Sequence, residues 1–198
     1  MAKKRLGKKT AAPGRLRIVG GRLRSRVLPV PAVEGLRPTP ERVRETLFNW
    51  LAEVTEGSRC LDLCAGTGAL GFEALSRGAA QVTFVENSRV ASSALQKAAD
   101  LLEASNVTIA NADALQWLAT APASAFDIVF VDPPYAAGLV PDLCRLLDTR
   151  GWLADRALVY LEHDKRQAAP LLPENWLSLK DKNAGNVRYC LFAVQAAR

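Results

Sequence analysis

The sequence has no long hydrophobic run that could cross a bilayer. A membrane-spanning helix needs about 18 to 20 consecutive apolar residues, and no segment approaches that length. The basic N-terminus is not followed by the apolar stretch of a secretion signal. We therefore expect a cytoplasmic protein with one ordinary core, which 198 residues are enough to build.

Metal ligands are also scarce. His163 is the only histidine, and the four cysteines, which are Cys60, Cys64, Cys144 and Cys190, include no C-x-x-C pair. A zinc site normally needs clustered cysteine and histidine ligands, so no metal is expected. We predict reduced thiols that pack as small apolar side chains.

Acidic residues are absent from positions 1–33, which carry ten of the 26 lysines and arginines. The remaining 16 basic residues face 20 acidic ones, so the body of the chain is slightly acidic. A basic arm on such a body favours a polyanionic partner, most simply a nucleic acid, over a merely solubilising tail.

The second half of this arm, "RLRIVGGRLRSRVL", alternates basic and apolar residues. The alternation predicts a β-hairpin that turns at Gly20-Gly21. The apolar face would hold Leu16, Ile18, Leu23 and Val27. The opposite face would hold Arg15, Arg17, Arg22, Arg24 and Arg26, which we expect to contact nucleic acid.

Beyond the arm, "LRPTPERVRETLFNWLAEV" predicts a helix with Thr39 as N-cap and Pro40 at its first position. Its core face would hold Val43, Leu47, Trp50, Leu51 and Val54. Strand-like and helix-like segments then alternate. Strands are predicted over 59–63, 81–85, 107–110, 126–131 and 157–161, helices over 88–103, 114–119 and 140–148, and a final hairpin turning at 183–186.

This alternation predicts a doubly wound α/β fold, with a mostly parallel sheet and an antiparallel hairpin at one edge. We divide the chain into a basic arm with its hairpin, residues 1–36, and a main domain, residues 37–198.

The stretch "CLDLCAGTGALGFEAL" places Gly66, Gly68 and Gly71 between the first strand and a helix. This G-x-G-x-x-G spacing is typical of a site that binds an adenosine-containing ligand at the carboxyl ends of the strands. Glu86 ends the next strand, where a carboxylate can accept from both ribose hydroxyls. A nicotinamide dinucleotide and S-adenosylmethionine both fit this much of the pattern.

Two acids favour S-adenosylmethionine. Asp62 lies four residues before Gly66, where a carboxylate suits a cationic amino-acid group better than a pyrophosphate. Asp113 follows the third strand in "NADAL", where it can accept from an adenine amino group, with the backbone of Ala114 beside the ring. Asp113 can equally serve as the N-cap of the following helix, and the two roles are compatible.

The stretch "FDIVFVDPPYAAG" ends a buried strand with Asp132-Pro133-Pro134-Tyr135. Prolines fix the backbone and donate no hydrogen bond. The Asp132 carboxylate and the Pro133 carbonyl can therefore form a rigid acceptor clamp for a conjugated amine that gains positive charge as it is methylated. Tyr135 offers a flat face on which a base can stack.

The chain resembles the bacterial 16S ribosomal RNA (guanine-N2)-methyltransferase D family of class I S-adenosylmethionine-dependent enzymes. The resemblance rests on "RIVGGRLRSRVLPVP", "LRPTPERVRETLFNWL", "LDLCAGTGALGFEALSRGA", "VEN", "DPPY" and "YCLF". It implies a seven-stranded Rossmann-like sheet with an antiparallel last strand. It also implies methylation of the N2 amine of one guanine in 16S rRNA, within the assembled or assembling small ribosomal subunit.

The resemblance implies roles for individual residues. Asp62, Ala65, Gly66 and Gly68 would surround the methionine part of the cofactor, Glu86 the ribose, and Asp113 with Ala114 the adenine. Asp132 and Pro133 would hold the target amine, with Tyr135 against the base. Arg37 and Thr39 would close over the cofactor side, and Arg42 would face RNA with the arm. Cys64 stands where such enzymes often have glycine, which predicts less extreme backbone dihedrals there.

Other readings remain open from the sequence alone. The D-P-P-Y chemistry also suits adenine in DNA or RNA and a glutamine side chain of a protein. A ribosome-assembly factor with incidental catalysis is a third possibility. No general base is evident, since a lone histidine such as His163 is more often structural, and the product cation can lose its proton to Asp132 or water. A monomer is the simplest expectation.

Overall fold

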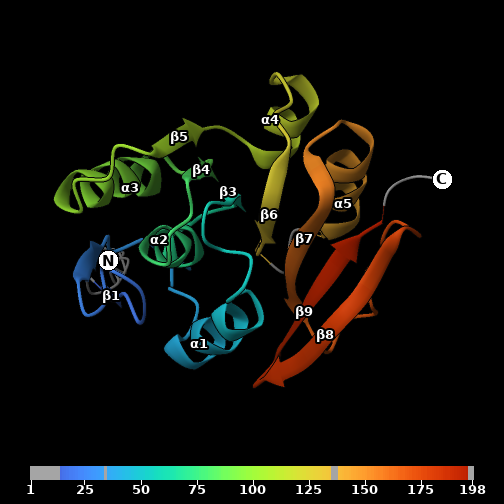
Figure 1. The fold of residues 1–198 in the computed structure, drawn as a ribbon, viewed down its shortest axis with the longest axis horizontal. Helices are drawn as coiled ribbons and strands as arrows, with labels where there is room; N and C mark the ends of the chain where they lie inside the picture. Colours follow the sequence, from blue (N-terminus) through green and yellow to red (C-terminus); the bar gives the residue numbers. More distant parts are fainter. Residues whose placement is uncertain (1–13, 34, 135–137, 196–198) are drawn as a thin grey trace, which may run out of the picture.

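The computed structural model describes residues 14–33, 35–134 and 138–195. Strands and helices alternate along most of the chain, as the sequence predicts (Figure 1). The helices are α1 (Glu41–Trp50), α2 (Ala69–Ser76), α3 (Arg89–Leu101), α4 (Ala114–Thr120) and α5 (Val140–Thr149). The strands are β1 (Gly14–Arg17), β2 (Val27–Val30), β3 (Arg59–Leu63), β4 (Gln81–Glu86), β5 (Val107–Asn111), β6 (Phe126–Val131), β7 (Leu153–Asp164), β8 (Trp176–Ala184) and β9 (Val187–Val194).

Seven strands form one sheet in the order β5-β4-β3-β6-β7-β9-β8. The first five are parallel neighbours, and β9 is antiparallel to β7 and β8. The predicted seven-stranded, mostly parallel sheet with an antiparallel last strand is confirmed. The chain order reverses between β3 and β6, the point at which sheets of this kind bind ligands beyond the carboxyl ends of their strands.

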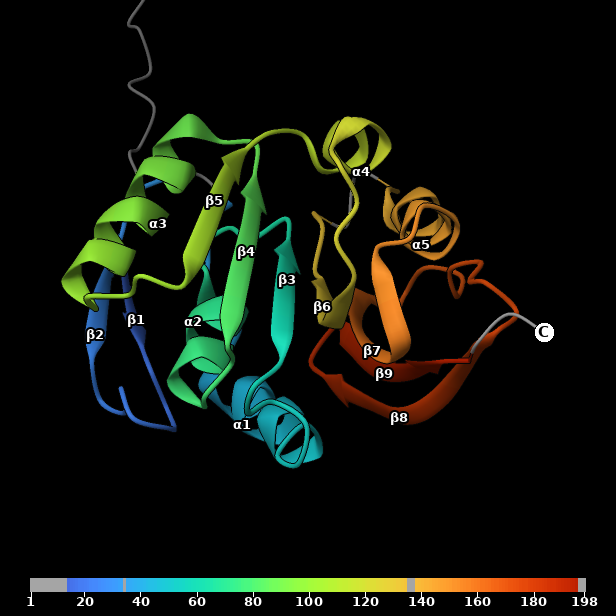
Figure 2. The same ribbon diagram turned by 45° about the horizontal axis from the view of Figure 1, so that its top comes forward.

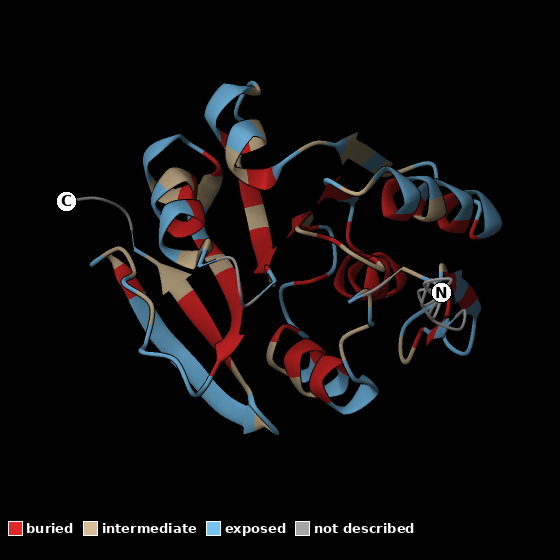
Figure 3. Ribbon diagram, turned by 180° about the vertical axis from the view of Figure 1, so that it is seen from behind, coloured by how far each residue is buried: buried red, intermediate tan, exposed pale blue. Residues whose placement is uncertain are grey.

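Helices cover both faces of the sheet (Figure 2). The N-terminal hairpin, α1, α2 and α3 share one apolar core, and α4 and α5 share the other. Side chains of β6 alternate between the two cores: Phe130 belongs to the first, and Val129 and Val131 to the second. Figure 3 shows the contrast between the largely buried β6 and the largely exposed edge strand β8.

The N-terminal hairpin exists, but its turn differs from the prediction. β1 pairs with β2 from Gly14↔Val30 to Arg17↔Val27, and residues 18–26 form successive turns instead of continuing the ladder. These turns interrupt the predicted alternation of buried and exposed side chains. Val27, which we expected to be buried, is 46% exposed, and Leu28 is buried instead. Leu16, Ile18 and Leu23 are buried as predicted.

Helix α1 begins one residue later than predicted. Pro40 is its N-cap residue, with no side-chain cap, and the Pro40 carbonyl accepts from the N–H groups of Val43 and Arg44 at 3.0 Å. The prediction of Thr39 as the cap is therefore wrong. Val54 lies beyond the end of the helix and is exposed, so the helical spacing of apolar residues stops at Leu51.

The other predicted segments are found, with β3 and β6 matching at both ends. β7 is longer than the predicted 157–161 because its ladder with β9 continues to Asp164↔Val187. Three cysteines are buried and Cys64 is half-buried, and all four thiols are free, as predicted. Within the described residues, no helix combines the length and apolarity needed to cross a membrane.

Candidate functional site

The glycine loop between β3 and α2 is tied to the neighbouring strand β4. The Ala65 N–H donates to the Val85 carbonyl at 2.9 Å, and the Gly68 N–H donates to the Ala65 carbonyl at 2.7 Å. Gly66 and Gly68 have φ values of +55° and +73°, in the left-handed region that glycine adopts without steric cost. The loop therefore places its backbone at the carboxyl edge of the sheet without bulky side chains.

Cys64 begins this loop with a φ of 67°. The prediction of a less extreme conformation is wrong, because the chain keeps the left-handed turn even without glycine. Such a conformation costs roughly 1–2 kcal/mol for a residue with a Cβ atom, and the hydrogen bonds of the following residues hold it. Burial, followed by the charges of Glu86 and Asp62, raises the pKa of the thiol to about 12, so the thiol stays protonated.

Two acids fix the loop from opposite sides. Asp62 Oδ2 accepts from the Gly71 N–H at 2.9 Å, in the first turn of α2. Glu86 Oε2 accepts from the Gly66 N–H at 2.7 Å, and its Oε1 accepts from the Ser88 N–H at 2.7 Å. Both acids are buried, and both lie where the sequence places the cofactor.

The predicted adenine-side residues lie at the end of β5. Asp113 is the N-cap residue of α4, and its Oδ1 accepts from the Gln116 N–H at 2.9 Å, which confirms the capping role. Asn111 Nδ2 donates to the Glu86 carbonyl at 2.8 Å and so ties the ends of β5 and β4 together. Ala114 is buried beside them, and contact of this corner with adenine stays a prediction.

Asp132 and Pro133 follow β6 directly, beside the glycine loop. Because Leu63 pairs with Val131, the next pair of residues along the two strands is Cys64 and Asp132. Pro133 is buried and Pro134 is exposed. Tyr135 lies outside the described residues.

Four buried or half-buried acids line this edge on one face of the sheet: Glu86 from β4, Asp62 from β3, Asp132 after β6 and Glu162 from β7. Side chains two positions apart in a strand lie on the same face of the sheet. The residues two positions before these acids all belong to the core that contains the hairpin and α1 to α3, so the four acids share that face; these residues are Phe84, Cys60, Phe130 and Tyr160. Sequence reasoning missed Glu162, although it directly follows the apolar run "LVYL" much as Asp132 follows "DIVFV".

The negative charges of these acids repel one another. Burial raises the pKa of Asp62 to about 7, the Gly71 N–H lowers it, and the charge of Glu86 raises it further. Burial also raises the pKa of Asp132 well above its usual value, and the charges of Glu162 and Asp62 add to that rise. An edge that disfavours its own negative charges is suited to a cation.

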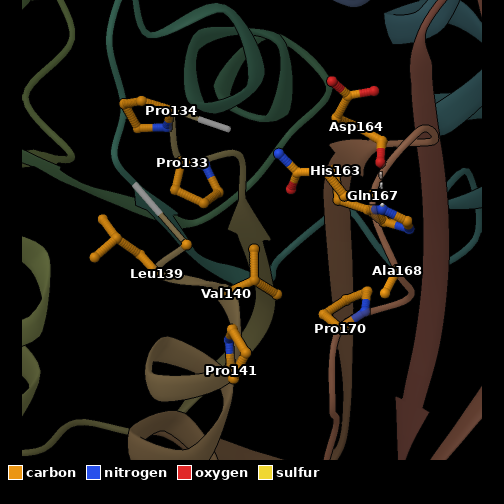
Figure 4. Close-up of a pocket in the computed structure, with 11 residues that line it drawn as sticks. Pro133, Pro134, Leu139, Val140, Pro141, His163, Asp164, Gln167, Ala168 and Pro170 are labelled. Carbon is orange, nitrogen blue, oxygen red and sulfur yellow. Dashed lines mark hydrogen bonds between the residues drawn. The ribbon is translucent and has the colours of Figure 1, made fainter. Parts of the chain in front are cut away.

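A cavity of about 160 Å³ opens next to the clamp (Figure 4). Pro133 and Pro134 line it from the end of β6, and His163 and Gln167 from the end of β7 and the turn that follows. His163 is buried, and its Nδ1 lies 3.3 Å from the Asp164 carbonyl oxygen. The histidine thus belongs to the lining of this cavity.

The five arm arginines (Arg15, Arg17, Arg22, Arg24 and Arg26) are all exposed, as are Arg37 and Arg42. Leu36 contacts the glycine loop, since a Cβ placed on Gly66 would lie 3.3 Å from Leu36 Cδ1. The segment that carries Arg37 and the half-buried Thr39 therefore starts against the glycine loop. Roles for these two residues stay predictions.

The arm is held by buried charges that sequence reasoning did not identify. Glu73 on α2 is fully buried, and its two carboxylate oxygens accept from the Val19 and Gly20 N–H groups at 3.0 and 2.8 Å. Arg44 and Arg77 form ion pairs with the same carboxylate at 3.1 and 2.8 Å. The contacts of Glu73 with Val19 and Gly20 join segments more than 50 residues apart, which no local pattern indicates.

Within the parts of the chain that are described, no group of three histidine, cysteine or acidic side chains could hold a metal ion. The acids at the sheet edge are instead distributed along four strands. The site thus offers carboxylates and a rigid pair of acceptors to an organic ligand.

Comparisons with known proteins give a consistent result. Residues 16–193 match the family described as Conserved hypothetical protein 95. Ribosomal RNA small subunit methyltransferase D of Escherichia coli (strain K12) is 48% identical over 183 residues, which cover 92% of each chain. The Haemophilus influenzae protein of the same name is 44% identical over 185 residues, covering 91% of this chain and 95% of its own. A solved structure of the Escherichia coli protein yhhF superposes with a TM-score of 0.87 at 46% identity, covering 93% of this chain and 100% of that one.

Proposed function

The chain belongs to the ribosomal RNA small subunit methyltransferase D family, and on that premise we propose that it methylates the exocyclic N2 amine of one guanine in 16S rRNA. The observation that carries the proposal is the placement of the Asp132–Pro133 clamp beside the glycine loop, at one edge of one sheet. A methyl donor and an amine acceptor need to meet at such a place. The choice of guanine rests on the family.

The acids at the sheet edge fit S-adenosylmethionine, which supplies an electrophilic methyl group from a positively charged sulfur. Its positively charged sulfonium and ammonium groups would compensate the electrostatic repulsion among Asp62, Glu86 and Asp132. A dinucleotide would instead bring the negative charges of its pyrophosphate to the same carboxylates. The charge pattern therefore favours S-adenosylmethionine over a nicotinamide cofactor.

Individual contacts follow from the positions of the residues. Asp62, Ala65, Gly66 and Gly68 would hold the methionine part, and Glu86 the ribose hydroxyls. Asp113 and Ala114 would meet the adenine, with the segment from Leu36 to Thr39 over the loop. Glu86 keeps acceptor capacity for this role, because each ionised carboxylate oxygen can accept more than one hydrogen bond.

Asp132 and Pro133 would position the target amine. The guanine N2 lone pair is delocalised into the ring, so the amine is a weak nucleophile. Acceptors aimed at its two hydrogens favour a pyramidal nitrogen and stabilise the positive charge that develops there. Pro133 and Pro134 keep the acceptors rigid, and Tyr135 would stack on the base.

The exposed arginines of the hairpin would bind RNA phosphates. Arginine offers a planar fork of donors that matches phosphate geometry. Because Glu73 holds the hairpin against α2, the arginines project from a fixed support. This arrangement suits a large, preformed RNA surface such as the small ribosomal subunit.

The test uses tritium-labelled S-adenosylmethionine with small ribosomal subunits from cells that lack this activity, beside naked 16S rRNA, duplex DNA and total protein. We expect label in the subunits, recovered as N2-methylguanosine. Asp132→Ala should lower the rate by roughly 10²-fold or more, because it removes an acceptor that acts in the transition state. The matched control is Asp127→Ala, which changes an acid at the opposite end of β6.

Each alternative has its own outcome in this experiment. Label in DNA or protein, and none in RNA, would keep the clamp chemistry but overturn the substrate. Binding of the cofactor without transfer to any acceptor would favour an assembly factor over an enzyme.

A further inference from the structure

A second buried acid lies beside the amine clamp. In the parallel ladder of β6 and β7, Val131 pairs with Leu161, so Asp132 and Glu162 occupy the next position along the two strands. Glu162 is only 3% exposed. Since side chains alternate along a strand, Asp132 and Glu162 both leave the sheet on the face of Phe130 and Tyr160.

Glu162 is held in place by a hydroxyl group. The Tyr160 hydroxyl donates to Glu162 Oε1 at 2.6 Å, and Tyr160 is itself fully buried. Burial and the charge of Glu162 raise the pKa of Tyr160 well above its usual value, so the phenol keeps its proton and remains a donor. The carboxylate therefore has a fixed orientation beside the clamp.

Among the described residues, the charges that shift the pKa of Asp132 are those of other acids. Glu162 and Asp62 raise it, after burial. The phenols of Tyr160 and Tyr189 lie on the same side, with Tyr189 opposite Glu162 in the β7–β9 ladder. Lys182 lies on this face beyond Tyr189, with its Nζ 5.8 Å from the centroid of the Trp50 ring. Two adjacent buried carboxyls cannot both carry a charge cheaply, so a proton on one makes ionisation of the other easier.

We propose that Glu162 is the proton partner of Asp132, a positioning residue that shares with it the proton released by the methylated amine. This inference rests on the proposed methyl transfer. The N2 lone pair forms a bond to the methyl carbon while the carbon–sulfur bond breaks and leaves its electrons on sulfur. The nitrogen cation then loses one N–H proton, whose bonding electrons return to nitrogen, and the Asp132–Glu162 pair takes up that proton. His163 and bulk water are not needed for this step.

The direct test is the titration of Asp132 in protein without cofactor, followed by ¹³C NMR of labelled aspartate carboxyl carbons. Wild-type Asp132 should titrate in two steps. Glu162→Gln keeps the size and the acceptor for Tyr160 but removes the neighbouring charge, so Asp132 should titrate in one step at lower pH. Asp127→Asn, at the other end of β6, is the matched control and should leave the Asp132 curve unchanged.

A second readout is the pH profile of single-turnover methylation of small ribosomal subunits. Glu162→Gln should slow transfer by roughly 10²-fold near neutral pH, a loss in the range of positioned proton acceptors, and should move the acidic limb of the profile. Glu162→Asp should recover part of the rate. Cofactor affinity should stay within about twofold, which separates this role from a change in binding.

The inference is overturned if Glu162→Gln leaves both the Asp132 titration and the pH profile unchanged. Should that variant fail to fold, Tyr160→Phe tests the same pair. Without the hydroxyl donor the ionised form of Glu162 is less stabilised, so Glu162 keeps its proton to higher pH and repels Asp132 less. The titration of Asp132 must then move to lower pH, as in Glu162→Gln, and an unmoved curve also counts against the pair. If wild-type protein methylates no RNA but Asp132 still titrates in two steps that depend on Glu162, the substrate proposal fails while the proton-sharing pair stands.

Discussion

Asp62 is a buried acid whose surroundings disfavour its charge. Its one described donor is the Gly71 N–H, which supports the ionised form. Burial outweighs that donor and raises the pKa of Asp62 to about 7. The folded protein without cofactor therefore holds a proton on Asp62 at pH values where the unfolded chain has already lost it.

This difference makes stability depend on pH. An unfolded aspartate titrates near pH 4, so between about pH 4 and pH 7 the folded state binds more protons. The free energy of unfolding should fall across that interval by an amount on the order of a few kcal/mol, and Asp62→Asn should flatten the fall. Urea denaturation of the cofactor-free protein at a series of pH values measures it.

The control for that experiment is Asp127→Asn. Its hydrogen bonds and ion pair with Arg59 lower the pKa of Asp127 despite partial burial, so Asp127 stabilises the fold above its unfolded pKa and loses that contribution in acid. Asp62→Asn should therefore change the dependence of unfolding free energy on pH above about pH 4, and Asp127→Asn should change it in more acidic solution. An unchanged slope between pH 4 and pH 7 in Asp62→Asn would show that Asp62 is not the group responsible.

Several hydrogen bonds join the N-terminal hairpin to helix α2. Besides the Glu73 contacts, the Leu23 N–H donates to Ser76 Oγ at 2.9 Å, and Ser76 Oγ donates to the Gly20 carbonyl at 2.5 Å. A Cβ on Gly21 would lie 1.9 Å from the Ser76 carbonyl oxygen, so the turn sits directly on the end of the helix. The hairpin is thus positioned by specific polar contacts as well as by its apolar face.

Glu73→Ala should loosen the attachment of the hairpin to α2. The change leaves Arg44 with a buried and uncompensated charge and removes the acceptor of two backbone N–H groups, so a loss of roughly 3–5 kcal/mol is expected. Trypsin cleavage after the arm arginines should then become faster in native conditions, as followed by mass spectrometry. Glu45→Ala, an exposed acid on α1, should leave cleavage unchanged. Equal cleavage rates in the two variants would contradict the proposed support.

Much of the fold could be predicted because the signals are local. The apolar runs that become β3 and β6 are bounded by turn residues, and both strands match the prediction at each end. The turns between Ile18 and Arg26 could not be predicted, because Glu73 and Ser76 hold them from more than 50 residues away. Gly20-Gly21 alone suggested a tighter hairpin and placed Val27 on the wrong face.

The candidate site likewise contains residues that the sequence indicates and one that only the sheet register reveals. The glycine loop and the acids Asp62, Glu86 and Asp132 follow strands directly, so the sequence indicates where they lie. Glu162 could not be assigned a role, because only the register of β6 against β7 brings it beside Asp132. The prediction placed Thr39 at the N-cap and Pro40 at the first helical position. In the structure Pro40 is the N-cap residue, so the helix starts one residue later than the Thr-Pro pair suggested.

The charge of the molecule is divided between a basic hairpin and an acidic sheet edge. The arginines lie on the hairpin, which packs with α1, α2 and α3, while the four acids lie at the carboxyl ends of the strands. One surface therefore attracts phosphates while the pocket attracts a cation. Under the proposed function, the first surface would meet RNA and the second the cofactor.

Binding to small ribosomal subunits should consequently weaken as salt rises. Counterion release makes the logarithm of the affinity fall linearly with the logarithm of salt concentration. Arg22→Ala or Arg24→Ala should each reduce that slope by about 1, if each arginine neutralises one phosphate. Arg145→Ala on α5, which removes an exposed arginine paired with Asp142, is the control and should leave the slope unchanged. Filter binding at several salt concentrations measures the effect, and equal slopes for all variants would exclude the hairpin as the RNA surface.

Strand β9 follows β8 in the chain but lies between β7 and β8 in the sheet. Tyr189 pairs with Glu162 on one side and with Lys182 on the other, so this strand supports the wall of the site that carries Glu162. β9 is made after both of the strands that it joins. The wall that carries Glu162 therefore forms later than the basic hairpin and the glycine loop, which belong to the first half of the chain.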